Sequence, residues 1–236
     1  MKRRTILLSA AGLMVPAGAH AQGAPPPPPA DTSRRPVAAT APAGQPPPRV
    51  TLTTTMGVIE ITLDPVGAPR TSAHMLRLFQ SGHYVGAAVY RIEPGFIIQL
   101  GDLDASWTHR WPPPPLVPGT TVELETENNR HARGTVSLAR GEDPNSGMST
   151  FYFDLAENSS LNATPGAPPN TTGYATFGRV TAGMEVLDAI EAVPRAPTGG
   201  PFPGKAPATP IVILSVTTDP PPRTPPRPRS PPRAPR

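Results

Sequence analysis

Between positions 49 and 219 of the 236-residue chain, apolar and polar residues alternate in short runs separated by turn-forming residues. Such alternation is typical of half-buried β-strands. The first run turns back at Thr54–Gly57, which predicts an opening hairpin. The further runs that predict strands are residues 85–100, interrupted at Pro94-Gly95, and residues 122–124, 134–139, 151–155, 174–180 and 211–216.

Two segments repeat their apolar residues at helical spacing instead. Residues 69–81 begin with a proline, which suits a first helical turn, and stop at Gly82. Residues 184–190 form a second amphipathic segment, which must end before Pro194. Many short strands with two helices predict a mainly β domain, built on an antiparallel sheet that closes to protect its edges.

The first 21 residues have the layout of a signal peptide. A basic start at residues 1–4 precedes an apolar run at residues 6–15 and the sequence Ala-His-Ala at residues 19–21. The apolar run is shorter than the roughly 20 residues that a membrane anchor needs. We therefore expect cleavage after Ala21 and a periplasmic or secreted protein. The paired arginines near the start leave the twin-arginine export route open beside the general secretory route, which we favour.

Proline divides the remainder of the chain. Residues 22–48 are rich in Pro and Ala, and residues 220–236 combine nine prolines with five arginines. Neither segment has enough apolar residues to offset the entropy of ordering, so both are predicted to be disordered. The single folded domain is expected at residues 49–219, which is within the usual size of one domain.

The net charge of +4 is the sum of an acidic central region and basic ends. Residues 49–219 hold 11 basic and 16 acidic residues, so the predicted domain is acidic, and the basic excess lies at the two ends. An acidic domain argues against nucleic acid as a partner. The arginine-rich tail is expected either to touch anionic envelope surfaces weakly or to serve solubility alone.

Several common kinds of active site are excluded by the sequence. Cysteine is absent, and the five histidines are scattered. We find no phosphate-binding glycine loop, no metalloprotease helix motif and no serine-hydrolase elbow. The sequence therefore predicts neither a metal nor a cofactor.

The most informative segment is Tyr90–Asp102, which reads Y-R-I-E-P-G-F-I-I-Q-L-G-D. Alternation would place Arg91 and Gln99 near an apolar surface supplied by Phe96 and Ile97, across the Pro-Gly bend. Without its surroundings, an arginine on a strand is usually a solvated surface residue. The functional interpretation therefore depends on the other motifs of the chain.

This segment resembles the sequence F-H-R-I-I-P-G-F-M-x-Q-G-G-D of cyclophilins. Four later segments resemble further motifs of that family in the same order: residues 134–139 (G-T-V-S-L-A), residues 143–153 (D-P-N-S-G-M-S-T-F-Y-F), Leu161-Asn162, and residues 174–180 (Y-A-T-F-G-R-V). The resemblance covers residues 49–218 and is closest to the bacterial periplasmic branch. It implies a closed eight-stranded antiparallel barrel capped by two α-helices. It also implies a peptidyl-prolyl cis-trans isomerase that assists the folding of exported proteins.

The resemblance also implies roles for individual residues. Arg91 would be the catalytic arginine, and Gln99 would orient it or the peptide carbonyl. The dry pocket for the proline ring would consist of Phe96, Ile97, Tyr152 and Leu161, with Tyr174 at its edge. The residues expected along the extended peptide are Ala139, Arg140 and Thr150. Its partners would be proline-containing exported polypeptides, and we expect a monomer.

The chain departs from the family pattern at several of these positions. Thr150 and Arg140 stand where most relatives have Gln and Asn, and Ser160 stands at about the position of the pocket tryptophan. These changes concern peptide contacts more than the proline pocket. Two other classes of function stay open at this stage: a proline-peptide-binding chaperone or adaptor with weak catalysis, and a structural envelope protein that acts through its tails.

Overall fold

The computed structural model describes residues 46–110, 121–127, 130–198 and 201–221. The predicted signal peptide, most of the linker and all but the first two residues of the tail lie outside the described residues. The order of elements is β1 (Arg49–Thr54), β2 (Gly57–Leu63), α1 (Pro69–Gln80), β3 (Ala87–Glu93), β4 (Ile97–Asp104), β5 (Thr135–Leu138), β6 (Phe151–Asp154), a 3-10 turn (Ser159–Leu161), β7 (Thr176–Ala182), α2 (Met184–Glu191) and β8 (Ile213–Asp219).

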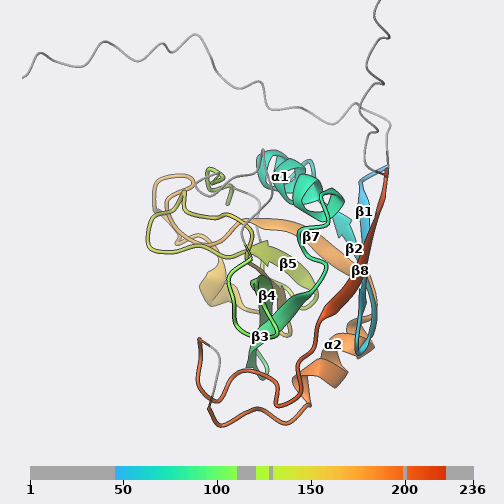
Figure 1. Cartoon of the computed structure of the whole chain (residues 1–236). Helices are drawn as coiled ribbons and strands as arrows, with labels where there is room; N and C mark the ends of the chain where they lie inside the picture. The colour runs from blue at the N-terminus through green and yellow to red at the C-terminus, as the bar shows by residue number, and fades with distance from the viewer. Residues whose placement is uncertain (1–45, 111–120, 128–129, 199–200, 222–236) are drawn as a thin grey trace, which may run out of the picture. The chain divides into compact units, whose positions relative to one another are not determined.

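The two helices begin where the sequence predicts, and each start has a local cause. Pro69 stands in the first turn of α1, and the carboxylate of Glu125 accepts hydrogen bonds from the amides of Arg70 (3.1 Å) and Thr71 (2.8 Å). Glu125 thus satisfies free amides at the helix start, because no side chain at the N-cap does so. The helix α2 follows Gly183, where a Cβ would lie 2.3 Å from the Val58 carbonyl oxygen. The two helices lie at opposite ends of the sheet (Figure 1).

The eight strands form one curled antiparallel sheet with the order β3-β4-β6-β5-β7-β2-β1-β8. The expected closed barrel needs correction, because no continuous ladder joins the end strands β3 and β8. They meet at an isolated bridge between Ala88 and Val212, beside two backbone bonds, from the Gly86 amide to the Ile213 carbonyl at 2.7 Å and from the Val89 amide to the Ile211 carbonyl at 2.9 Å. Pro210 has no amide hydrogen with which to extend this ladder. The result is a mainly β fold with two helices and an open seam.

One predicted strand is wrong. Residues 122–124 contribute a single bridge between Val122 and Gly147. The next backbone donor, the amide of Leu124, bonds to the side chain of Asn145 at 3.0 Å. A side-chain oxygen therefore accepts the hydrogen bond that the backbone of a neighbouring strand would otherwise accept. The alternation of apolar and polar residues in this segment reflects burial beneath a loop.

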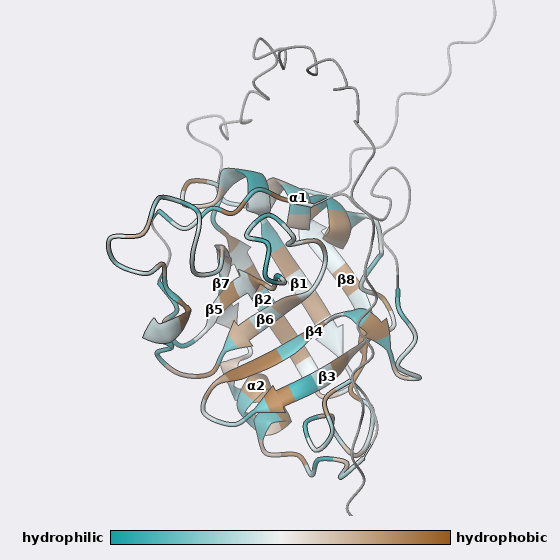
Figure 2. Cartoon of the chain, turned by 90° about the vertical axis from the view of Figure 1, so that its left-hand side faces the viewer, coloured by the Kyte–Doolittle hydropathy of each residue, from teal (hydrophilic) through white to brown (hydrophobic). Residues whose placement is uncertain are grey.

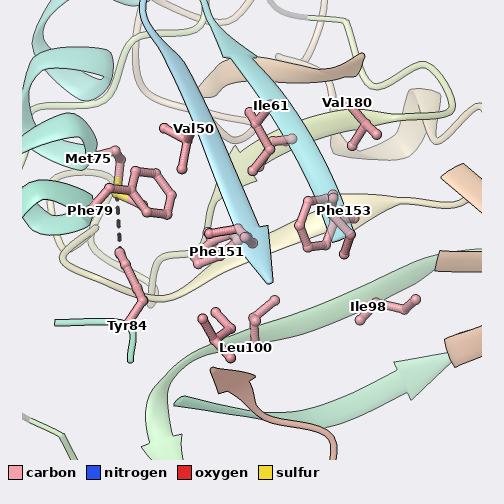
Figure 3. Packing of buried hydrophobic residues seen from close by; sticks show 14 of the residues in the cluster. Val50, Ile61, Met75, Phe79, Tyr84, Ile98, Leu100, Phe151, Phe153 and Val180 are labelled. Atoms are coloured by element: carbon pink, nitrogen blue, oxygen red, sulfur yellow. Dashed lines mark hydrogen bonds between the residues drawn. The ribbon is translucent and has the colours of Figure 1, made fainter. Parts of the chain in front are cut away.

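The hydrophobic core lies on the concave face of the sheet. Alternate residues of the central strands, such as Ile98, Leu100, Phe151 and Phe153, point into it and are nearly inaccessible (Figure 3). Apolar bands cross the successive strands in Figure 2. The residues between them point to the opposite face, so the core fixes which side chains reach the outer surface. Within the described ranges no helix has the length and apolar character needed to cross a membrane.

Candidate functional site

A row of polar side chains crosses four adjacent strands on the outer face of the sheet. Strand register pairs Arg91 with Gln99, Gln99 with Tyr152, and Tyr152 with Ser137. Residues paired in this way project to the same face of a sheet. Arg91 and Gln99 are in direct contact, since Nη1 of Arg91 donates to Oε1 of Gln99 at 3.1 Å.

The guanidinium of Arg91 is held from three sides. Besides the bond to Gln99, its Nε donates to Oε1 of Glu93 at 3.2 Å. Its Cζ atom lies 5.1 Å from the centroid of the Phe202 ring, within the range of a cation–π interaction. The Arg91 side chain is 27% exposed, so the held cation still faces solvent and can meet a peptide.

Glu93 links this arginine to the loop before β8. Nζ of Lys205 lies 2.6 Å from Oε2 of Glu93, and the Ile92 amide donates to the Lys205 carbonyl at 2.8 Å. The hydrogen bond from Lys205 is the main cause that holds the pKa of Glu93 below its usual value; the bond from Arg91 adds to it, and burial opposes it. Glu93 is therefore a fixed carboxylate beside Arg91. In the cyclophilin sequence quoted above, isoleucine occupies this position.

Tyr152 forms the buried wall at the other end of the row. Its side chain is 3% exposed, and its hydroxyl lies 3.1 Å from Nε2 of His131. The other ring nitrogen, Nδ1, lies 2.9 Å from Oδ1 of Asn162. Burial lowers the pKa of His131, so the ring is neutral: it donates to Asn162 through Nδ1 and accepts from the tyrosine through Nε2. The hydroxyl of Tyr152 is thus bonded to His131, and its ring presents an apolar surface.

Tyr174 and Arg140 continue this aromatic wall. The ring of Tyr174 packs edge-on against Tyr152, with centroids 6.0 Å apart. Cζ of Arg140 lies 4.9 Å from the centre of the Tyr174 ring, and its Nε donates to the Gly173 carbonyl at 2.9 Å. The Tyr174 amide donates to the Leu161 carbonyl at 3.2 Å, so Leu161 adjoins the same wall.

Phe96 and Ile97 follow the Pro-Gly bend as predicted. The carbonyl of Phe96 accepts hydrogen bonds from the Leu155 amide and from Nδ2 of Asn158, both at 2.9 Å. Ile97 is 4% exposed, and its side chain projects to the same face as Gln99 because the two are separated by one residue. Ile97 therefore belongs to the strand that carries Gln99, and Phe96 directly precedes that strand.

A cleft of about 320 Å³ continues from Gln99 along the outer face. Ala139, Arg140 and Thr150, which the sequence places along the peptide, line it together with Gln99. The structure thus brings these four predicted residues to one cleft. Ser160, at the position matched to the pocket tryptophan, is exposed and supplies no aromatic surface.

A buried carboxyl lies on the same face, on the strand that carries Tyr152. Asp154 is fully inaccessible, and Nδ2 of Asn158 donates to its Oδ1 at 2.7 Å. Burial raises the pKa of Asp154 to about 7, against the effect of the hydrogen bond from Asn158. The register pairs Asp154 with Ile97, so this titrating group belongs to the floor of the site.

The sequence prediction missed several residues that contact the predicted site. They are Glu93, His131, Phe202 and Lys205. Glu93 could have been noticed as a charged residue in place of the isoleucine of the quoted motif. Phe202 and Lys205 lie in a loop without periodicity, where only the fold reveals that the loop returns to Arg91.

The site offers a fixed cation and amide donors beside a dry aromatic wall. Across the described ranges, no group of three or more His, Asp or Glu residues is arranged to hold a metal ion. Such an arrangement can bind an apolar ring and stabilise developing negative or lone-pair character next to it. It presents no activated nucleophile in the row.

Comparison with known proteins gives a consistent result. Residues 49–218 match the family model described as cyclophilin type peptidyl-prolyl cis-trans isomerase/CLD. The chain is 36% identical over 167 residues to peptidyl-prolyl cis-trans isomerase A of Dickeya dadantii, covering 70% of this chain and 82% of that protein. It is 35% identical over 167 residues to a peptidyl-prolyl cis-trans isomerase of Streptomyces antibioticus, covering 70% and 95%.

Solved structures give the same fold. A cyclophilin type peptidyl-prolyl cis-trans isomerase of Cryptosporidium parvum superposes with a TM-score of 0.55 at 22% sequence identity, covering 71% of this chain and 94% of that one. The same protein has been solved in the presence of the dipeptide Ala-Pro.

Proposed function

Because this chain belongs to the cyclophilin-type peptidyl-prolyl cis-trans isomerases and is an enzyme of that class, we propose that Arg91 and Gln99 carry the catalysis, on X-Pro bonds of exported polypeptides. The observation that supports the assignment best is the strand register that aligns Arg91, Gln99 and Tyr152 on the outer face. The Ala-Pro dipeptide used with the Cryptosporidium protein supports proline-containing peptides as substrates.

Isomerisation of an X-Pro bond requires no covalent intermediate between enzyme and substrate. Rotation about an X-Pro bond loses amide resonance, and the barrier is about 18–20 kcal/mol. As the bond twists, the prolyl nitrogen gains a lone pair, so a fixed donor is worth more at the top of the barrier than in either planar form. Arg91 is that donor in our proposal, because its guanidinium keeps its charge and has N–H groups beyond those bonded to Gln99 and Glu93.

The neighbouring residues bind and orient the peptide. The apolar surfaces of Phe96, Ile97, Tyr152 and Leu161, with Tyr174 at the edge, take the proline ring. Gln99 gives its carbonyl to Arg91, so its amide nitrogen is the group that remains for a peptide carbonyl. The residues that line the cleft for the extended peptide are Ala139, Arg140 and Thr150.

The predicted signal peptide indicates the compartment in which the enzyme meets its substrates. We propose that residues 1–21 direct export and that the mature protein acts on exported chains in the periplasm or outside the cell. Mass analysis of the N-terminus after expression in a bacterial host tests this: a mature protein that begins at Gln22 supports export, and an uncleaved chain in the cytoplasm contradicts it.

Isomerisation itself is tested by exchange spectroscopy on a proline tetrapeptide, which measures cis-trans interconversion directly. Catalytic amounts of the full chain should accelerate exchange, and Arg91→Ala should remove most of that acceleration. Peptide binding without accelerated exchange would instead fit the chaperone or adaptor interpretation.

A further inference from the structure

A second cavity, of about 490 Å³, adjoins the site and is lined in part by Phe202. The ring of Phe202 packs over the guanidinium of Arg91 and also lines this cavity. Tyr90, which precedes Arg91 in β3, lines both this cavity and the cleft that contains Gln99. The cavity therefore lies within the reach of residues flanking a proline bound at Arg91.

The walls of the cavity are largely aromatic. Tyr90 and Phe202 are stacked with their centroids 6.1 Å apart, and Trp107 faces the same space. Trp107 adopts a φ of 63°, which is uncommon for a bulky residue. Its turn is fixed by Oδ1 of Asp104, which accepts the amides of Ser106 (2.8 Å) and Thr108 (3.0 Å). The backbone turn that carries the indole is therefore fixed before any ligand arrives.

The acidic group at the cavity is Asp102. Its side chain is 28% exposed, and its Oδ1 has no hydrogen-bond partner among the residues that the structure describes. The nearest basic group, Nδ1 of His109, lies 3.8 Å from Oδ2. The guanidinium of Arg110 donates instead to the carbonyls of His83 (3.1 Å) and Val85 (2.6 Å). Oδ1 itself is buried, so a donor from outside the chain would reach Asp102 through the part of its side chain that is exposed.

We propose that this cavity is a substrate subsite for a basic side chain, arginine or lysine, carried within a few residues of the isomerised proline. Aromatic faces beside a carboxylate are suited to a cation, and an arginine guanidinium can stack on a ring while it donates to the acid. The acidic net charge of residues 49–219 attracts the same class of peptide. The inference rests on the proposed function, because the subsite matters only if a proline is bound at Arg91.

The subsite is also connected to the catalytic pair. The hydroxyl of Tyr90 interacts with Asp102 and with Gln99, and burial together with the charge of Asp102 raises the pKa of Tyr90. A cation that binds at Asp102 is therefore linked through Tyr90 to the glutamine that holds Arg91. A substitution at Asp102 can also affect Gln99 and so change activity on every peptide. The subsite must therefore be measured as the ratio of kcat/KM for two peptides on the same enzyme.

The test uses matched proline peptides that contain either arginine or its neutral isostere citrulline. The variable residue is moved from three positions before the proline to three positions after it, and kcat/KM is measured for the full chain at low salt. We expect about a fivefold preference for arginine at one position, the scale of a partly exposed cation–π contact with an acid nearby. Asp102→Asn should bring the ratio close to one, and Trp107→Leu should reduce it.

Glu60→Gln is the matched control, because Glu60 is an exposed acid on β2, a strand that contributes no residue to the cavity. It should leave the arginine-to-citrulline ratio unchanged. A ratio near one at every position, with both peptides isomerised, overturns the subsite and leaves the isomerase assignment intact. A preference that survives in Asp102→Asn also overturns it. Absence of turnover for all peptides would count against the proposed function instead.

Discussion

Nε of Arg91 donates to Oε1 of Glu93 at 3.2 Å, between two residues that lie on the same face of β3 because one residue separates them. The bond occupies one edge of the guanidinium, and the bond to Gln99 occupies Nη1. The remaining N–H groups are therefore presented in a fixed direction. This arrangement makes Glu93 a positioning residue, since it acts on a peptide only through Arg91.

Replacing Glu93 by glutamine should lower kcat several-fold, by about three to five times, with little change in KM. The reason is that a partly exposed ion pair is worth up to about 1 kcal/mol, and this one orients Arg91, the group that acts in the transition state of the proposed mechanism. Peptide exchange kinetics measure the effect. Glu127→Gln, which removes an exposed acid elsewhere, is the control. An increase in kcat would mean that the negative charge of Glu93 opposes catalysis more than its bond to Arg91 assists it.

Ser160 predicts weak inhibition by cyclosporin. The family's sensitivity to this inhibitor is attributed to the pocket tryptophan, and Ser160 stands at about that position. Ser160 is exposed and offers no ring to the inhibitor. Calorimetric titration should give weak binding to the natural chain and tighter binding to Ser160→Trp. Nanomolar binding to the natural chain would show that another residue supplies this contact.

Asp154 should make stability fall as pH rises from about 4 to 7. Its pKa is about 7 in the folded chain, above the ordinary value of 3.8 for this carboxyl, so over this range the unfolded chain loses its proton first. The folded state binds more protons, and the stability it loses is on the order of 4 kcal/mol. Denaturant unfolding at several pH values should show a flatter profile for Asp154→Asn.

Glu185→Gln, at an exposed position of α2, is the control for this titration and should keep the natural pH profile. If Asp154→Asn loses stability in parallel with the natural chain, another group is responsible for the pH dependence.

The sequence predicted the helices and most strands because their periods record burial directly. Residues 184–190 needed only apolar spacing and the following Pro194 to define α2. The open seam between β3 and β8 could not be predicted in this way, since it depends on which backbone groups of distant segments meet. Residues 122–124 failed for a related reason, because an alternating pattern reports a buried face but does not identify a hydrogen-bonding partner.

Some residues of the candidate site could likewise be predicted from the sequence, and others could not. Arg91 and Gln99 could be found because they belong to a contiguous motif whose register the bend at Pro94-Gly95 fixes. Phe202 could not, because it reaches Arg91 from 111 positions further along the chain, through a loop with no period. His131 was missed because its role depends on lying between Tyr152 and Asn162 in space.

In the proposed mechanism Arg91 stabilises the twisted prolyl bond, and exchange spectroscopy on a proline tetrapeptide with the Arg91→Ala variant measures that contribution. We expect kcat/KM to fall at least tenfold, since each loss of about 1.4 kcal/mol in transition-state stabilisation is a factor of ten. Arg91→Lys should recover only part of the activity, because an ammonium cannot bond to Gln99 and Glu93 in the same geometry. Circular dichroism and the unfolding midpoint verify that each variant folds. Unchanged kcat/KM in folded Arg91→Ala would remove Arg91 from the mechanism.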